Sequence, residues 1–213
     1  MNLMILVQER KKVFEQKRFE LVKRFKDFLK KLFFKLAEQI IKEKKPRDEL
    51  TLDKHNTTHE MLFFKYKPLM KSSSISDKDG FKELKESYCQ SMHIPYKKEI
   101  VEYFLEIKND LKKIKESKSH HFLLGDKNNY DEIEHINDSE RIDFKFKNII
   151  LTLSDVILNE QVFCSEFFHL KLQQNVSEQE RIKIEEEMLS IIFKGIDSKL
   201  ENLIDYFDKK LDR

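Results

Sequence analysis

The sequence predicts an all-α protein, built as an elongated antiparallel bundle of long helices. Of its 213 residues, 38% are charged, while only three are glycine and three are proline. Turn-rich β proteins need more turn-forming residues than this, whereas charged, glycine-poor chains are typical of long amphipathic helices. Apolar residues also recur at helical spacing over most of the chain. We therefore expect long helices, with a helical hairpin at the C-terminal end.

The first expected helix spans residues 8–45 and is basic. Pro46 is a suitable stop, because proline cannot continue a helix. Residues 8–47 hold 15 Lys+Arg and 6 Asp+Glu, whereas residues 131–213 hold 11 Lys+Arg and 19 Asp+Glu. The two ends of the chain therefore carry opposite charge. The apolar stripe of this helix comprises Phe14, Leu21, Phe25, Phe28, Leu32, Leu36 and Ile40, widened by Val22, Leu29 and Phe33.

Three interpretations of the basic helix remain open from the sequence. Its lysines and arginines can simply solvate the outer face of a core helix. The helix can instead lie on anionic plasma-membrane lipid or bind an acidic partner. Nucleic-acid binding is disfavoured, because the aromatic residues share the apolar stripe and do not alternate with the basic ones. The candidate contacts to an anionic surface are Lys23, Arg24, Lys30 and Lys31.

The middle of the chain is expected to alternate between helix and loop. Residues 47–58 are polar, residues 59–70 form a short apolar segment, and residues 71–80 read as a Ser/Asp/Gly loop. A helical pattern then starts near Gly80, is interrupted at Pro95 and resumes, which predicts either one kinked helix or two helices joined by a turn. Its apolar positions are Phe81, Leu84, Tyr88, Met92, Tyr96, Ile100, Phe104, Ile107, Leu111 and Ile114. We assign residues 1–116 to an N-terminal helical region and residues 117–138 to a flexible linker.

The C-terminal hairpin is expected to occupy residues 139–213. Ser139 is a suitable N-cap for a helix to residue 172, and residues 173–176 break the pattern. Ser177 and Glu180 have the spacing of a capping box, which predicts the start of a last helix that continues to the chain end. Gly195 stands inside that last stripe, where it either allows close helix approach or costs about 1 kcal/mol. A short turn between two long helices predicts antiparallel packing.

Glu160 and Gln161 interrupt the most continuous apolar stripe of the sequence, in the helix that begins near residue 139. A carboxylate at a core position is costly unless it is paired. Two interpretations follow. Glu160 can pair with a lysine on a neighbouring helix of the same chain and fix the helix register. Alternatively, this face docks against a helix of another subunit.

No catalytic, cofactor or metal motif is evident. Glycine-rich phosphate loops, nucleophile elbows and metalloprotease signatures are missing, which predicts a non-enzymatic protein without a small-molecule substrate. His55 and His59 stand four residues apart and His120 is next to His121, but metal sites need three or four ligands. The two separate cysteines and the lack of a long apolar run favour a cytoplasmic protein.

The segment from Phe144 to Leu172 resembles one in the Sec-three subunit of the exocyst, a vesicle-tethering complex. The shared motif, E-Q-x-F-x-x-x-F-F, falls on Glu160, Gln161, Phe163, Phe167 and Phe168. Two further blocks, residues 60–70 and residues 84–104, are similar to family segments that occur in the same order. Together the likeness extends over about residues 14–207.

The resemblance implies an elongated stack of helical bundles of the tethering-complex type. It also implies a non-enzymatic role, holding secretory vesicles at the plasma membrane together with other exocyst subunits. The five motif residues become candidate contacts to those partners. Only the central helical region of the family is matched, so lipid and GTPase binding by the family's N-terminal domain is not carried over. Pro95 also departs from the family pattern, which usually continues as helix there.

Overall fold

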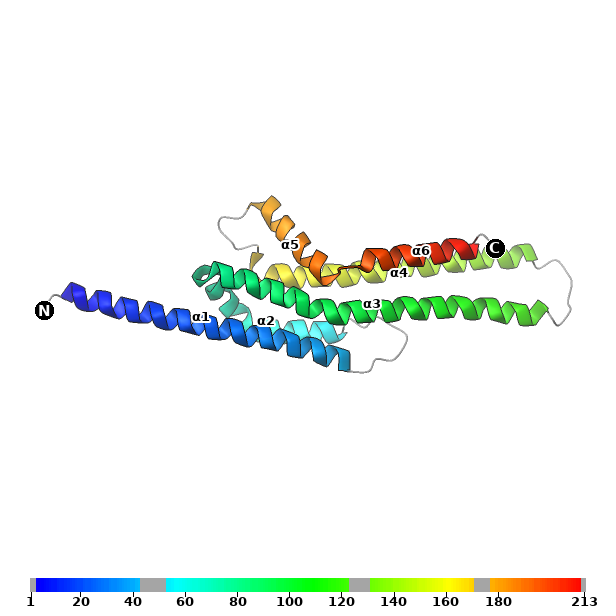
Figure 1. Cartoon of the computed structure of the whole chain (residues 1–213). Coiled ribbons are helices and arrows are strands. Elements are labelled where there is room, and N and C mark those ends of the chain that lie inside the picture. The colour runs from blue at the N-terminus through cyan, green and yellow to red at the C-terminus, as the bar shows by residue number, and fades with distance from the viewer. Residues whose placement is uncertain (1–2, 43–52, 123–130, 171–176, 212–213) are drawn as a thin grey trace.

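The computed structural model describes residues 3–42, 53–122, 131–170 and 177–211, and within these ranges it contains six helices and no strand. The helices are α1 (Leu3–Lys42), α2 (Asp53–Ser76), α3 (Lys78–Phe122), α4 (Asp131–Phe167), α5 (Glu178–Ile192) and α6 (Ile196–Leu211). The all-α prediction is confirmed. Figure 1 shows an elongated arrangement in which α1, α2, α3 and α4 alternate in direction along one long axis.

Only the second half of α1 packs against the rest of the chain, chiefly against α3. Residues 4–21 are all exposed, and Val22 is the first buried residue. The predicted stripe is therefore only partly correct. Phe14, Leu21 and Phe28 are exposed, and the buried face is centred on the residues expected only to widen the stripe, Leu29 and Phe33. In Figure 1 the first half of α1 projects beyond the other helices.

The predicted loop at residues 71–80 is wrong. α2 continues through Pro68 to Ser76, and α3 begins at Lys78, so Asp77 alone separates them. The Asp77 carboxylate accepts a hydrogen bond from the Gly80 N–H at 2.8 Å, which caps the start of α3. A Cβ atom at Gly80 would collide with that carboxylate, so a larger residue there would displace the Asp77 side chain. Asp77 and Gly80 thus form a helix cap here, where the sequence suggested a loop.

α3 continues through Pro95 as one helix, so the alternative of two helices joined by a turn is not what the structure contains. Its predicted apolar stripe is buried from Phe81 to Phe104. Helix also covers both ends of the predicted linker, since α3 extends to Phe122 and α4 begins at Asp131. Residues 123–130 lie outside the described residues.

The C-terminal hairpin is present, but its last helix is divided. Ser177 caps α5: its Oγ accepts the Glu180 N–H at 3.2 Å, and the Glu180 carboxylate accepts the Ser177 N–H at 2.9 Å. The capping box is therefore confirmed. The expected continuous helix breaks at residues 193–195, where Gly195 has a φ of 83°, a conformation that favours glycine. After this break α6 lies along α4, whereas α5 diverges from it (Figure 1). The expected turn at residues 173–176 and the stop at Pro46 lie outside the described residues.

Two buried clusters hold the helices together. The larger one contains residues of the five helices from α1 through α5, and the smaller one contains residues of α3, α4 and α6. Phe193 packs against both clusters. The largest fully buried side chains of the larger cluster are Leu29, Phe33, Leu62, Met70, Leu84, Tyr88, Met92, Tyr96, Phe167 and Phe168. The smaller cluster consists of Ile100, Phe104, Ile149, Leu153, Leu203 and Phe207. The N-terminal region and the C-terminal hairpin therefore share their core.

Candidate functional site

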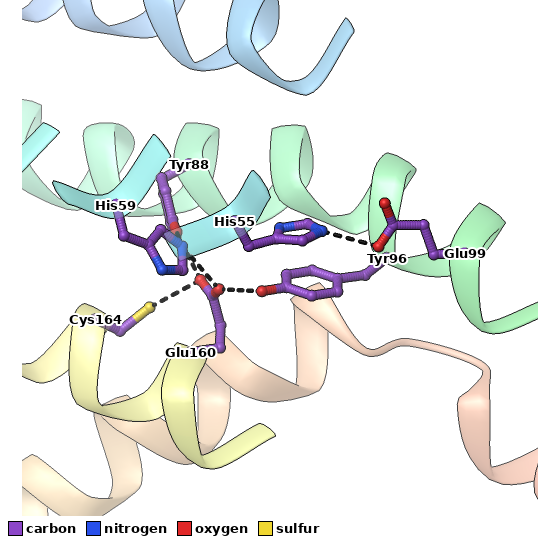
Figure 2. A network of polar contacts seen from close by, with 7 residues as sticks. All are labelled: His55, His59, Tyr88, Tyr96, Glu99, Glu160 and Cys164. Atoms are coloured by element: carbon purple, nitrogen blue, oxygen red, sulfur yellow. Dashed lines mark hydrogen bonds and ion pairs between the residues drawn. The ribbon is translucent and has the colours of Figure 1, made fainter. Parts of the chain in front are cut away.

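Glu160 is fully buried at the centre of the bundle, where α4 faces α2 and α3. Figure 2 shows its carboxylate pointing between these helices, surrounded by His59, Tyr88 and Tyr96. We call these four residues the Glu160 cluster. They come from three helices, so the cluster connects segments that are far apart in the sequence.

Both carboxylate oxygens of Glu160 are occupied. Oε1 accepts a hydrogen bond from the Tyr88 hydroxyl at 2.6 Å, and Oε2 accepts one from the Tyr96 hydroxyl, also at 2.6 Å. His59 Nε2 lies 3.2 Å from Oε2 and 3.2 Å from the Tyr88 hydroxyl. The Cys164 thiol, one turn further along α4, makes a weaker contact with Oε1 at 3.6 Å. Hydrogen bonds to an ionised group are stronger than those between neutral groups, so the cluster is held tightly.

Ring stacking fixes the two histidines. The His59 ring stacks on Phe163 with centroids 4.0 Å apart, and the His55 ring stacks on Tyr96 at 4.2 Å. His55 Nε2 also lies 2.9 Å from a carboxylate oxygen of Glu99, which extends the polar contacts along α3 (Figure 2). The histidines are therefore oriented by packing on one side and by carboxylates on the other.

The charge of Glu160 is maintained by its neighbours. Burial raises the pKa of the Glu160 carboxyl, but the charge of His59 and the hydrogen bonds from His59, Tyr88 and Tyr96 outweigh it and lower the pKa to about 2. Burial and the adjacent carboxylate together raise the pKa of both tyrosine hydroxyls well above their usual value. At neutral pH the cluster thus contains an ionised Glu160 and two protonated tyrosines.

The buried thiols are unreactive in this setting. Cys89 and Cys164 are free and buried. Burial, with a smaller contribution from Glu160, raises the pKa of Cys89 to about 12 and that of Cys164 well above its usual value. Both thiols therefore remain protonated at neutral pH, and a protonated thiol is a poor nucleophile.

The motif residues predicted as partner contacts lie inside the chain's own bundle. Glu160 pairs within its own chain, as one of the two interpretations predicted. The predicted lysine partner is wrong, because the basic side chain beside Glu160 is His59 of α2. Gln161 is half-buried and donates to Glu185 of α5 at 3.1 Å. Phe163, Phe167 and Phe168 are buried in the larger core cluster. A docking role for these residues would require the helices to separate.

The sequence contains two signals for this cluster, one in its tyrosines and one in its histidines. Tyr88 and Tyr96 stand in the buried stripe of α3, and a buried tyrosine hydroxyl normally finds a hydrogen-bond partner. His55 and His59 lie one turn apart on one helix, where their segment was expected to lack helical pattern. Two tyrosines, two histidines and one carboxylate in apolar stripes therefore predict a shared polar contact, although no spacing rule says which helices provide it.

Of the two histidine pairs, only the side chains of His55 and His59 belong to the described residues. No group of three or more metal-ligating side chains is found in that part of the chain. His55 and His59 contact Glu99 and Glu160 separately, with ring centroids 6.4 Å apart. The side chains of His120 and His121 lie outside the described residues.

The basic face of α1 is the second candidate site. Lys23, Arg24 and Lys31 are exposed, as expected for contacts with an anionic surface. Lys30 is instead half-buried and pairs with Glu83 of α3 at 2.8 Å. The sequence did not reveal that residues 4–21, which we call the α1 arm, extend beyond the bundle with their apolar side chains exposed. No helix in the described ranges is long and apolar enough to span a bilayer.

Comparisons of this chain with protein families, with curated proteins and with solved structures gave no match. The fold and the two sites define a helical protein in which buried polar groups hold helices together.

The buried carboxylate predicts a specific acid sensitivity. The pKa of Glu160 falls from 4.5 to about 2 on folding, so its stabilisation is present above pH 4.5 and is lost as the pH falls towards 2. Between about pH 6 and about pH 3, we expect the free energy of unfolding of the unsubstituted protein to fall by about 2 kcal/mol more than that of the Glu160→Gln variant. Urea unfolding of both proteins at several pH values measures this. Equal pH dependence in the two would contradict the assigned pKa.

Proposed function

We propose that this chain is a non-enzymatic subunit of the exocyst, which tethers secretory vesicles to the plasma membrane through helix–helix contacts with other subunits. The proposal rests on the resemblance to the Sec-three subunit. One structural observation supports it most. The described parts of the segments that carry the resemblance, residues 60–70, 84–104 and 144–170, pack against one another around the Glu160 cluster.

This convergence gives the family-like motif a physical meaning. The three segments that carry the resemblance all contribute to a single core, the larger cluster. Tyr88 and Tyr96 lie in the second segment, and Glu160 and Phe163 lie in the third. The motif then marks the architecture of the bundle, and contacts with other subunits fall on its outer surfaces.

The chemistry of the buried groups supports a scaffold in preference to an enzyme. Both oxygens of Glu160 are engaged by side chains of the chain itself, and the two thiols are protonated. Gln161, Glu185 and Arg181 form a second polar contact, between α4 and α5, with Arg181 2.9 Å from Glu185. Both the contacts of Glu160 and those of Glu185 therefore connect helices or successive turns of one helix.

Affinity purification of the full chain from its own cells, followed by identification of the proteins that accompany it, tests the proposal. We expect other exocyst subunits in proportions that persist on gel filtration. Their consistent absence would overturn the proposal. Substitutions at Phe163 and Phe167 are unsuitable for this test, because both side chains are buried and their loss would disrupt the fold.

The alternative, a peripheral membrane protein, rests on the same basic helix and needs its own measurement. Flotation with phosphatidylserine vesicles at low and high salt provides it. Binding that fades as salt rises would favour the alternative, because charge-driven attraction is screened. We expect the full chain to bind these vesicles no better than neutral ones.

A further inference from the structure

The α1 arm presents a regular surface that the rest of the described chain leaves uncovered. Val7, Phe14 and Leu21 stand seven residues apart, which places them in one row along the helix. Their side chains are 59%, 71% and 65% exposed, and Phe28 continues the row at 48%. Isolated exposed apolar residues are normal, but a continuous row of them along a projecting helix marks an interaction surface.

Positive charge lines both sides of this row. In a helix, the residues three and four positions after a given residue lie on opposite sides of it. Arg10, Lys17 and Arg24 each follow a residue of the row by three positions, so they lie along one side of the row. Lys11 and Arg18 occupy the other side. A surface depression over the arm is lined by Val7, Arg10, Lys11, Phe14, Glu15 and Arg18. Around Phe14 the row is therefore one residue wide, and five cations in all border the row, while apolar residues flank its two ends at Met4 and Phe25.

The buried part of α1 shows how an apolar row with neighbouring cations packs against a partner helix. Where α1 packs on α3, the buried Leu29 and Phe33 are accompanied by Lys26 and Lys30. Both lysines pair with Glu83 of α3, at 3.2 and 2.8 Å. The α1–α3 contact thus combines apolar packing with lysine–glutamate pairs at its edge. The α1 arm continues the same helix and also combines apolar residues with neighbouring cations. No other helix of the described chain covers it.

We infer that the α1 arm docks an acidic amphipathic helix of a partner protein, with an apolar ridge against Val7, Phe14 and Leu21 and carboxylates opposite the flanking cations. At 1.5 Å per residue the 18-residue arm is about 27 Å long, enough for several turns of helix pairing. The inference rests on the proposed function in one respect, since an exocyst subunit would supply this helix.

Two other occupants fit the surface less well. A second copy of the arm would bring its own five cations against these five, and like charges across an interface are unfavourable. A membrane-bound helix needs a broad apolar sector to enter the lipid, whereas this row is narrow and has cations on both sides.

Site-specific photo-crosslinking tests the inference in the full chain. Phe14 is replaced by p-benzoylphenylalanine, and a control chain carries the same replacement at Phe19, which is also exposed but lies on a different face of the helix. Both chains are expressed in their own cells, irradiated and analysed by mass spectrometry. We expect position 14, and not position 19, to crosslink to an acidic segment with helical apolar spacing in another protein. Crosslinks to this same chain, to lipid, to a segment without acidic residues or to nothing would overturn the inference.

Charge reversal supplies a matched control. Arg10→Glu with Lys17→Glu alters the cations beside the row, whereas Lys12→Glu with Lys23→Glu makes the same charge change on the opposite side of the helix. The first pair should reduce crosslinking at position 14 about tenfold or more, and the second should leave it nearly unchanged. Equal effects would show a general charge attraction and overturn the assigned surface.

The outcomes separate this inference from the proposed function. If exocyst subunits co-purify with the chain but position 14 gives no crosslink to an acidic helix, the arm inference fails and the proposed function stands. If exocyst subunits are consistently absent from the purified material and position 14 crosslinks to an acidic helix of another protein, the docking surface stands and the proposed function fails.

Discussion

Replacement of Glu160 by alanine is expected to lower the free energy of unfolding by about 3–5 kcal/mol, the usual cost of removing one partner from a buried ionic pair. The substitution leaves His59 and the hydroxyls of Tyr88 and Tyr96 buried without the acceptor that they share. Single-domain stabilities are about 5–15 kcal/mol, so this loss would remove a large part of the total. Urea unfolding followed by far-ultraviolet circular dichroism measures it.

A carboxylate on the exposed side of the same helix provides the control. Glu166 is exposed and lies 3.5 Å from Lys67, so Glu166→Ala should change stability by less than about 1 kcal/mol. Tyr88→Phe and Tyr96→Phe each remove one hydrogen bond to the charged carboxylate and should cost about 1.5–3 kcal/mol. If Glu160→Ala were as mild as Glu166→Ala, the buried network would not be holding the helices together.

The fold class and one helix start could be predicted because they depend on local chemistry. Helical spacing of apolar residues predicts helices whatever their neighbours are, and the capping box at Ser177 is satisfied within four residues. Helix ends that depend on tertiary packing were less accessible. The break at Gly195, after which α6 packs with α3 and α4 in the smaller cluster, is one such end.

The candidate site shows the same division between local and non-local information. The sequence identified Glu160 as energetically unusual, since a carboxylate at a core position needs compensation. The identity of the compensating groups depends on how three helices are placed beside one another, and no spacing within α4 contains that information. The partner is a histidine on α2, together with two tyrosines from α3.

The α1 arm illustrates the converse case. Its stripe has the periodicity of a core helix, so burial of Phe14 and Leu21 was one of the interpretations that the sequence left open. Periodicity shows that a face is apolar, but it cannot show whether the chain itself covers that face. The structure makes this distinction, because residues 4–21 of α1 are exposed and burial begins at Val22. An apolar stripe can thus belong partly to a core and partly to an interface.

Replacement of Phe167 by alanine is the second change for which a large effect is expected, a loss of about 3–5 kcal/mol in the free energy of unfolding. The Phe167 ring is fully buried and contacts three other phenylalanine rings, with centroids 5.0 Å from Phe163, 5.1 Å from Phe168 and 6.4 Å from Phe33. Its removal leaves a cavity between α1 and α4 that the surrounding rings fill only partly. Phe14→Ala makes the same chemical change at a site that is 71% exposed and should alter stability by less than about 0.5 kcal/mol.

This pair of variants also distinguishes the two roles that a phenylalanine can have in this chain. In urea unfolding Phe167→Ala should shift the midpoint strongly while Phe14→Ala leaves it in place. In photo-crosslinking from position 10, with Arg10 replaced by the crosslinking residue, Phe14→Ala should instead lower the yield to partner protein. A stable Phe167→Ala variant that had lost only its partners would contradict this structure, because the motif phenylalanine would then act as a contact to another subunit and not as part of the core.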